Sequence, residues 1–192
     1  GGNGLDNLPT SFVVADSPIG VKAHPVLYAN GYFTTADGVS ATHVAMWNGT
    51  SWSAFSNRPP SVDNDAIRVL AVLDDDGDGP LAPALYAGGP FRMPGETEQY
   101  PLARWDGTSW SLLGRGAFSI SALAVFDPDG AGPQPSELYV GGYFNRIDGV
   151  AAQNFARWNG SSWSAVPLPG YWTYPLTVVD DDGEGPILPA LY

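Results

Sequence analysis

The chain contains no cysteine and only two histidines among its 192 residues. Without cysteine there is no disulfide framework, no thiolate nucleophile and no thiolate metal site. His24 and His43 lie far apart in the sequence at non-equivalent positions, so they do not indicate a Ser-His-Asp arrangement. Because no nucleophile can be paired with a base, we expect that the chain is not an enzyme.

Basic residues are also scarce: eight Lys and Arg stand against 20 Asp and Glu, for a formal net charge of −12. This charge repels phosphate backbones and anionic membrane surfaces, so nucleic acid is not an expected partner. No run of ~18 apolar residues is present, and we therefore expect no membrane insertion through a transmembrane helix. Cations are the counter-species that this composition favours.

Turn-forming residues are abundant instead. With 24 Gly, 18 Pro and 44% hydrophobic residues, the composition favours a packed chain with many turns and few helices. A Leu-Tyr pair recurs along the chain, with its tyrosines roughly 53 to 58 residues apart: Tyr28, Tyr86, Tyr139 and Tyr192. An Asp precedes each tyrosine at a constant distance: Asp16, Asp74, Asp127 and Asp180. Such a period indicates a repeat architecture in which each repeat buries one face against its neighbour.

Each repeat is expected to form four short strands. In the third repeat they are predicted at residues 121–126, 137–144, 155–158 and 162–166, with a connecting loop at 145–150. The Asn159-Gly160 dipeptide favours a tight hairpin turn between the last two strands. The first strand is apolar on both faces, whereas the last is rich in serine. This gradient is typical of a propeller blade whose first strand lies at the centre.

The predicted fold class is therefore all-β: a β-propeller segment of four-stranded antiparallel blades, with about three complete blades and a partial fourth. The blades are expected at residues 11–56, 66–113 and 120–166, and the partial blade at 174–192. Because closed propellers have ~4–8 blades, we expect a piece of a longer protein or one partner of an assembly. Other blades of the same protein or neighbouring subunits would complete it. Unpaired sheet edges would also permit a linear filament.

Residues 138–144, 148–149 and 156–164 together resemble a kelch-type β-propeller repeat. The double glycine that ends the second strand and the tryptophan of the third strand carry this likeness. The chain is similar to bacterial extracellular propeller repeats and to fungal cortical polarity-marker repeats. It departs from them in the first copy, where Asn30 replaces a glycine and Met46 an arginine. The resemblance implies a bacterial extracellular or cell-surface protein, but no single function, because propellers serve many roles.

The turn after the first strand of a repeat is rich in carboxylates. An Asp-x-Asp-x-Asp-Gly spacing is the one by which calcium loops present oxygen ligands from alternate positions. The sequence therefore predicts Ca²⁺ sites with the ligands Asp74, Asp76 and Asp78, and Asp180, Asp182 and Glu184. Neither copy has the bidentate Glu that completes such a loop, so binding is expected to be weak. The alternative is a solvated Asp/Gly turn without a metal.

Tryptophan pairs flank the hairpin turns of the first three repeats: Trp47/Trp52, Trp105/Trp110 and Trp158/Trp163. Recurring large aromatic residues are expected to staple neighbouring blades, and stacking on sugar rings is the alternative. Trp172 lies outside the pairs and is a candidate for exposure. Arg104 and Arg157 share one repeat position and are expected to pair with an acidic group inside the sheet.

These patterns predict a non-catalytic structural or adhesion protein, extracellular or at the cell surface, whose blade loops form the contact surface. Calcium would stiffen the Asp-rich loops, and glycans or surface proteins are the expected external partners. A carbohydrate-binding, lectin-like propeller is the alternative. A third reading is an enzyme whose active site lies in further blades, which a His or Cys cluster there would support.

Overall fold

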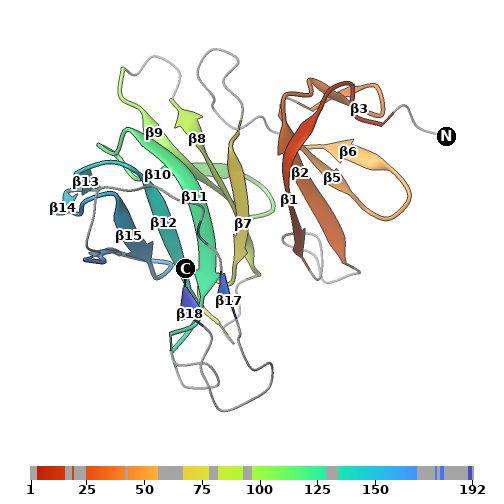
Figure 1. The fold of residues 1–192 in the computed structure, drawn as a ribbon. Coiled ribbons are helices and arrows are strands. Elements are labelled where there is room, and N and C mark those ends of the chain that lie inside the picture. Colours follow the sequence, from red (N-terminus) through yellow and green to blue (C-terminus); the bar gives the residue numbers. More distant parts are fainter. Residues whose placement is uncertain are drawn as a thin grey trace.

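The computed structural model describes residues 4–15, 19, 25–41, 43–55, 67–77, 82–92, 97–128, 134–167, 176, 178–179 and 190–191. Every regular element in these ranges is a β-strand, and none of their segments is a helix that could cross a membrane. Three four-stranded antiparallel sheets follow one another along the chain (Figure 1). The all-β class and the four-stranded antiparallel sheets predicted from the sequence are therefore confirmed.

Each large sheet is a meander, so that its strands pair in the order in which they occur in the sequence. The first sheet consists of β1 (Pro9–Ala15), β2 (Val26–Gly31), β5 (Val44–Trp47) and β6 (Trp52–Ala54). The second consists of β7 (Val69–Leu73), β8 (Ala84–Phe91), β9 (Tyr100–Trp105) and β10 (Trp110–Leu113). The third consists of β11 (Ser119–Phe126), β12 (Glu137–Tyr143), β15 (Phe155–Trp158) and β16 (Trp163–Ala165). β17 (Val178–Val179) and β18 (Ala190–Leu191) pair separately.

Two short hairpins lie in the connections between the second and third strands of a sheet. β3 (Thr35–Ala36) pairs with β4 (Val39–Ser40), and β13 (Arg146–Ile147) pairs with β14 (Val150–Ala151). The sequence predicted a connecting loop at 145–150, whereas the structure forms a hairpin there. Its turn residues Asp148 and Gly149 have φ values of 45° and 86°, which an Asp-Gly pair adopts at low cost and which a tight hairpin requires.

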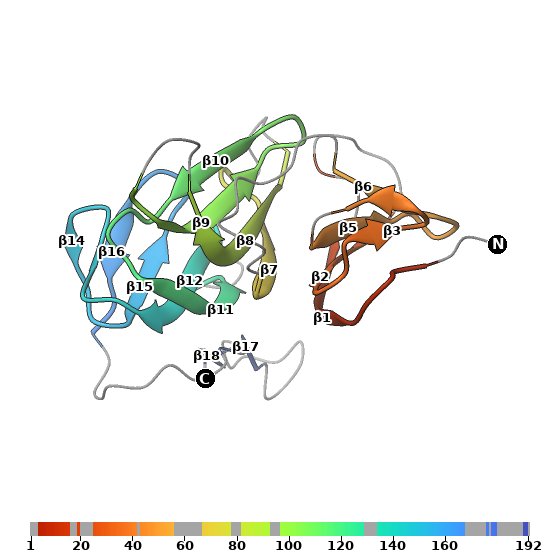
Figure 2. The same ribbon diagram turned by 90° about the horizontal axis from the view of Figure 1, so that it is seen from above.

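The three sheets lie side by side in chain order (Figure 2). Side chains of the second sheet alternate between its two faces, as the period of two along a strand requires. One face packs on the first sheet through Leu70, Leu85 and Trp105. The opposite face packs on the third sheet through Leu73 and Tyr86. Because both faces are covered, β7 and β8 are apolar along nearly their whole length.

The glycine that carries the likeness to kelch repeats has a steric role. Gly142 lies where β12 passes the beginning of β11, and a β-carbon there would come 2.0 Å from the Ser119 carbonyl oxygen. Gly31 is its counterpart in the first sheet, where a β-carbon would come 2.3 Å from the Leu8 carbonyl oxygen. Both contacts fall beside a register shift between the first two strands of the sheet. Any larger residue would therefore displace the backbone.

Candidate functional site

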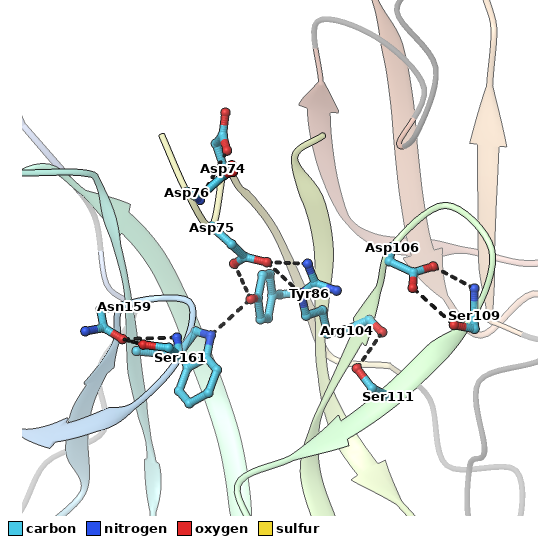
Figure 3. Close-up of polar contacts among 11 residues, drawn as sticks. Asp74, Asp75, Asp76, Tyr86, Arg104, Asp106, Ser109, Ser111, Asn159 and Ser161 are labelled. Atoms are coloured by element: carbon cyan, nitrogen blue, oxygen red, sulfur yellow. Dashed lines mark hydrogen bonds and ion pairs between the residues drawn. The ribbon is translucent and has the colours of Figure 1, made fainter. Parts of the chain in front are cut away.

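The Asp-rich loop after β7 brings Asp75, rather than Asp74 or Asp76, against its own sheet and the next one (Figure 3). Asp74 accepts a hydrogen bond from the Asp76 N–H at 3.4 Å, and burial raises the pKa of Asp74 despite this bond. The other predicted calcium ligands lie outside the described residues: Asp78, Asp180, Asp182 and Glu184. Within the described part of the chain, no three His, Cys, Asp or Glu residues are grouped to hold a metal ion.

Asp75 is nearly buried, with 6% of its side chain exposed. The Tyr86 hydroxyl on β8 donates a hydrogen bond to one carboxylate oxygen at 2.5 Å, and Arg104 Nε on β9 donates to the other at 2.6 Å. From the third sheet, the Trp158 indole N–H donates to the Tyr86 hydroxyl at 3.1 Å. These four side chains, which we call the Asp75 network, therefore connect the second and third sheets.

The pKa values of Tyr86 and Arg104 are both raised within the Asp75 network. Burial, and then the hydrogen bond to Asp75, raise the pKa of Tyr86. Burial acts to lower the pKa of Arg104, but the hydrogen bond and charge of Asp75 outweigh it and raise that pKa. Both groups are thereby held further from titration near neutral pH. Both shifts follow from burial and from the contact with Asp75.

The hairpin turn between β15 and β16 packs directly on the Asp-rich loop. Gly160, at the turn, has a φ of 89°, and a β-carbon there would come 2.5 Å from the Asp75 backbone oxygen. The turn of the third sheet thus fits against the loop of the second only because residue 160 has no side chain.

Arg104 and Arg157 both pair with acidic groups, as predicted, but only the partner of Arg157 lies inside the sheet. Arg157 on β15 occupies the register of Arg104, and its guanidinium donates to Glu137 at 2.9 Å. The two carboxylates come from different places, since Asp75 lies in a loop and Glu137 begins β12. Spacing alone identified the arginines but not their partners.

The hairpin turns are closed by an Asn or Asp side chain at their first position, Asn48, Asp106 and Asn159. Each side-chain oxygen accepts hydrogen bonds from the backbone N–H groups two and three residues later, which is an Asx turn. Partial burial acts to raise the pKa of Asp106, but the hydrogen bonds from Ser109 and Thr108 outweigh it and lower that pKa to about 2. These residues stabilise the turns.

The tryptophan pairs are cross-strand neighbours that contribute to the contacts between sheets. Trp105 and Trp110 lie 5.4 Å apart between ring centroids, and Phe55, at the end of the first sheet, lies 5.4 Å from Trp105 and 5.5 Å from Trp110. The Trp158 indole reaches the second sheet through the Asp75 network. The prediction that these rings staple neighbouring sheets is confirmed for the two described sheet contacts. Trp172 lies outside the described residues.

Asp148, in the β13–β14 turn, clamps the connection between the second and third sheets. One of its oxygens accepts hydrogen bonds from the Gly114 N–H and the Trp163 indole N–H, both at 2.8 Å. The other accepts from the Arg115 N–H at 2.8 Å. Asp37 makes the corresponding contact with the Gly4 N–H at 2.9 Å in the first sheet. From the sequence, residues 148–149 were identified only as part of the kelch-like pattern, which gave no indication of this role.

His43 has a structural role in the first sheet. It is buried, its φ is 70°, and its Nδ1 lies 3.1 Å from the Gly31 carbonyl oxygen. His24 lies outside the described residues.

An open cleft that the sequence did not predict lies at the end of the sheets where β8 and β10 finish and β9 and β11 begin. It has a volume of about 800 Å³. Three of the eight basic residues of the chain line it, Arg92, Arg115 and Arg146, and we call it the arginine cleft. These residues lie on three separate segments, so no local motif could have indicated that they converge.

Two exposed aromatic rings lie beside the arginine cleft. Phe118 and Tyr143 are 70% and 71% exposed, with ring centroids 6.0 Å apart in an edge-to-face arrangement. Both also line a neighbouring hollow of about 250 Å³, together with the amide side chains Asn145, Gln153 and Asn154. In the sequence, these aromatics are indistinguishable from the core aromatics around them.

Comparison with known proteins gives no relative: no protein-family model, no curated protein and no solved structure matches the chain. The assignment of a function therefore depends on the geometry described above.

Proposed function

We propose that the chain is a segment of a kelch-like β-propeller that acts as a non-catalytic structural or adhesion module, extracellular or at the cell surface. The observation that carries the proposal is that buried polar residues hold the sheets together. Asp75, Tyr86 and Trp158 connect two sheets, and Asp148 clamps the connection between them. Because these buried polar groups stabilise the scaffold, we expect binding of external partners to depend on the exposed loops. The location is taken from the resemblance to extracellular repeats.

The outer face of the first sheet supports the propeller part of the proposal. Val72 of β7 and Val125 of β11 occupy the same register, and each packs on the preceding sheet. Val14 of β1 occupies this register too, yet Val14 is 62% exposed and Phe12 beside it on the same face is 52% exposed. A further four-stranded sheet, from the rest of a propeller or from a neighbouring subunit, would cover this face as the others are covered.

Calcium at the Asp-rich loop is a second part of the proposal. The charges of Asp75 and Asp76 both contribute to the raised pKa of Asp74, so three carboxylates repel one another within one short loop. Calcium prefers oxygen ligands of this kind, and a bound ion would offset the repulsion and stiffen the loop.

The adhesion role is tested by immobilising the 192-residue chain and measuring its binding to purified cell-wall polysaccharides and extracellular proteins by biolayer interferometry. We expect binding to at least one surface polymer, which is lost when Phe118 and Tyr143 are both replaced by Ser. Val39→Ser is the matched control, because Val39 is also an exposed apolar residue but lies in β4. Release of cleavage products from a bound polymer would contradict the non-catalytic assignment.

Carbohydrate binding is a second candidate function, favoured by the exposed rings of Phe118 and Tyr143. Aromatic faces pack on the apolar faces of sugar rings. The amides of Asn145 and Gln153 in the adjoining hollow supply both donors and acceptors for sugar hydroxyl groups. Exposed aromatic rings next to amide groups suit a saccharide better than a purely apolar ligand.

A further inference from the structure

The arginine cleft concentrates positive charge in an acidic protein. The chain carries a net charge of −12, yet Arg92, Arg115 and Arg146 line one cleft. Two carboxylates also line the cleft, and both already interact with other groups of the protein. Glu98 forms an ion pair with Arg115, whose hydrogen bond lowers the pKa of Glu98, and Asp148 accepts three hydrogen bonds from N–H groups.

The other two guanidinium groups have donors available to a ligand. The Nε of Arg92 is buried and has no hydrogen-bond acceptor among the described residues. Arg146 is exposed in β13, and no ion pair within the described part of the chain includes it. Because the Arg92 Nε is itself buried, a ligand in the cleft would contact the terminal nitrogens of that guanidinium. Guanidinium groups match carboxylate and sulfate oxygens with paired hydrogen bonds.

The cleft is continuous with the aromatic surface. Phe118 lines both the arginine cleft and the amide-lined hollow beside it, and Tyr143 completes the hollow. A ligand that lies across Phe118 would therefore meet arginines on one side and amides on the other. At about 800 Å³, the cleft is within the range of ~300–1,000 Å³ that small ligands occupy.

We infer that this surface binds an acidic saccharide, with its anionic group on Arg92 and Arg146 and a sugar ring against Phe118 and Tyr143. The inference deepens the carbohydrate-binding candidate above and rests on it. The anionic group is a carboxylate or a sulfate. An acidic peptide would use the arginines, but it would leave the exposed rings and the amide-lined hollow without a matching group.

The test measures affinity by isothermal titration calorimetry at low salt for three oligosaccharides: oligogalacturonate, a heparin-derived oligosaccharide and neutral maltoheptaose. We expect the tighter-binding acidic oligosaccharide to bind at least tenfold more tightly than maltoheptaose. Preference for oligogalacturonate would indicate a carboxylate as the anionic group, and preference for the heparin-derived oligosaccharide would indicate a sulfate. Arg92→Gln and Arg146→Gln should each weaken acidic binding by about tenfold, the loss expected for one charged hydrogen-bonding group. Arg68→Gln is the charge-matched control outside the cleft lining and should change neither affinity.

Each contrary outcome identifies what is wrong. Equal affinity for acidic and neutral oligosaccharides, or no effect of either arginine variant, would overturn the acidic specificity and leave carbohydrate binding in place. Poly-L-glutamate binding as tightly as the acidic oligosaccharides would overturn the assignment to a saccharide. If no oligosaccharide binds to a chain whose thermal melt is intact, both the inference and the carbohydrate-binding candidate are wrong. Because Arg146 is exposed, its variant tests the inference even if Arg92→Gln does not fold.

Discussion

At the scale of single residues, Asp75 is the acceptor at the centre of the hydrogen bonds that connect the second and third sheets. Asp75→Asn leaves Arg104 without its ionic partner and weakens the acceptor of the Tyr86 hydroxyl. Because Arg104 keeps 21% exposure and can be partly hydrated, we expect a loss of about 2–3 kcal/mol, at or below the lower end of the range for a broken buried pair. Urea denaturation in a metal-free buffer measures it.

Asp74→Asn is the control for this prediction, since it makes the same chemical change one residue earlier. Burial raises the pKa of Asp74, so removing its charge should leave the free energy of unfolding unchanged or slightly higher. Equal losses in the two variants would show that Asp75 has no special role.

Calcium should act on the same loop. If Asp74 and Asp76 ligate Ca²⁺, saturating CaCl2 at pH 7 should raise the melting temperature by several degrees, because a ligand at 100 times its Kd stabilises by about 2.7 kcal/mol. Asp76→Asn should remove the increase, and MgCl2 should not replace CaCl2 because Mg²⁺ demands a stricter geometry. A melting temperature that is indifferent to CaCl2 would leave a solvated turn as the correct interpretation.

Asp106 should make stability depend on pH at acid pH. Its pKa is about 2 in the folded chain, below the ordinary value of 3.8, so its contribution is fully present above about pH 4 and is lost as the pH falls through 2. Because the group is largely exposed, the effect should stay below about 1 kcal/mol. Urea denaturation of the parent and Asp106→Asn at pH 5 and pH 2.5 should show a difference that shrinks at the lower pH. Asn159→Asp should gain the same dependence, and a constant difference would contradict the assignment.

Sequence patterns identified the importance of several residues but not their contacts. The Asp-x-Asp-x-Asp spacing singled out Asp74 and Asp76, whereas Asp75 between them makes the contacts to Tyr86 and Arg104. Along a strand, successive side chains point to opposite faces of the sheet, but in a turn the direction of a side chain does not follow from such an alternation. It depends on which neighbouring sheet the loop packs against, and the sequence does not specify that neighbour.

At the scale of elements, the hairpin turns have equivalent geometry but different surroundings. Gly160→Ala introduces both a strained φ and a clash with the Asp75 backbone, while Gly49→Ala introduces only the strain, because nothing lies within 4 Å of its β-carbon. We expect Gly49→Ala to cost about 1–2 kcal/mol and Gly160→Ala to cost about 1–3 kcal/mol more. Thermal denaturation of both variants measures the difference. Equal costs would mean that the turn and the Asp-rich loop separate readily.

Local chemistry made the strands and their turns predictable. Asn159-Gly160 lies in the predicted hairpin turn, where Gly160 supplies a positive φ and the Asn159 side chain accepts hydrogen bonds from the turn backbone. The β13–β14 hairpin was missed because its strands have only two residues each, too few for alternation to be visible. The arginine cleft was missed because its residues come together only when the second and third sheets pack.

At the scale of the whole molecule, the outer face of the first sheet should drive association. Phe12 and Val14 are exposed at register positions that are buried or partly buried in the other two sheets. We expect the chain to self-associate at high micromolar concentration, and the double substitution Phe12→Ser with Val14→Ser to restore a monomer in size exclusion with light scattering. Val39→Ser, an equally exposed apolar site in β4, should not restore it. A parent chain that remains monomeric would contradict this role for the face.

The meander order of the sheets also determines how the molecule responds to mechanical force. Because each large sheet is built from one continuous stretch of chain, pulling on the two ends can extract one sheet while the strand pairing of the next remains intact. Each extraction would release roughly 165–180 Å of extended chain, from about 50 residues at ~3.3–3.6 Å each. An adhesion protein built in this way would dissipate load in successive steps. The second and third sheets, which the Asp75 network connects, would unfold after the first sheet.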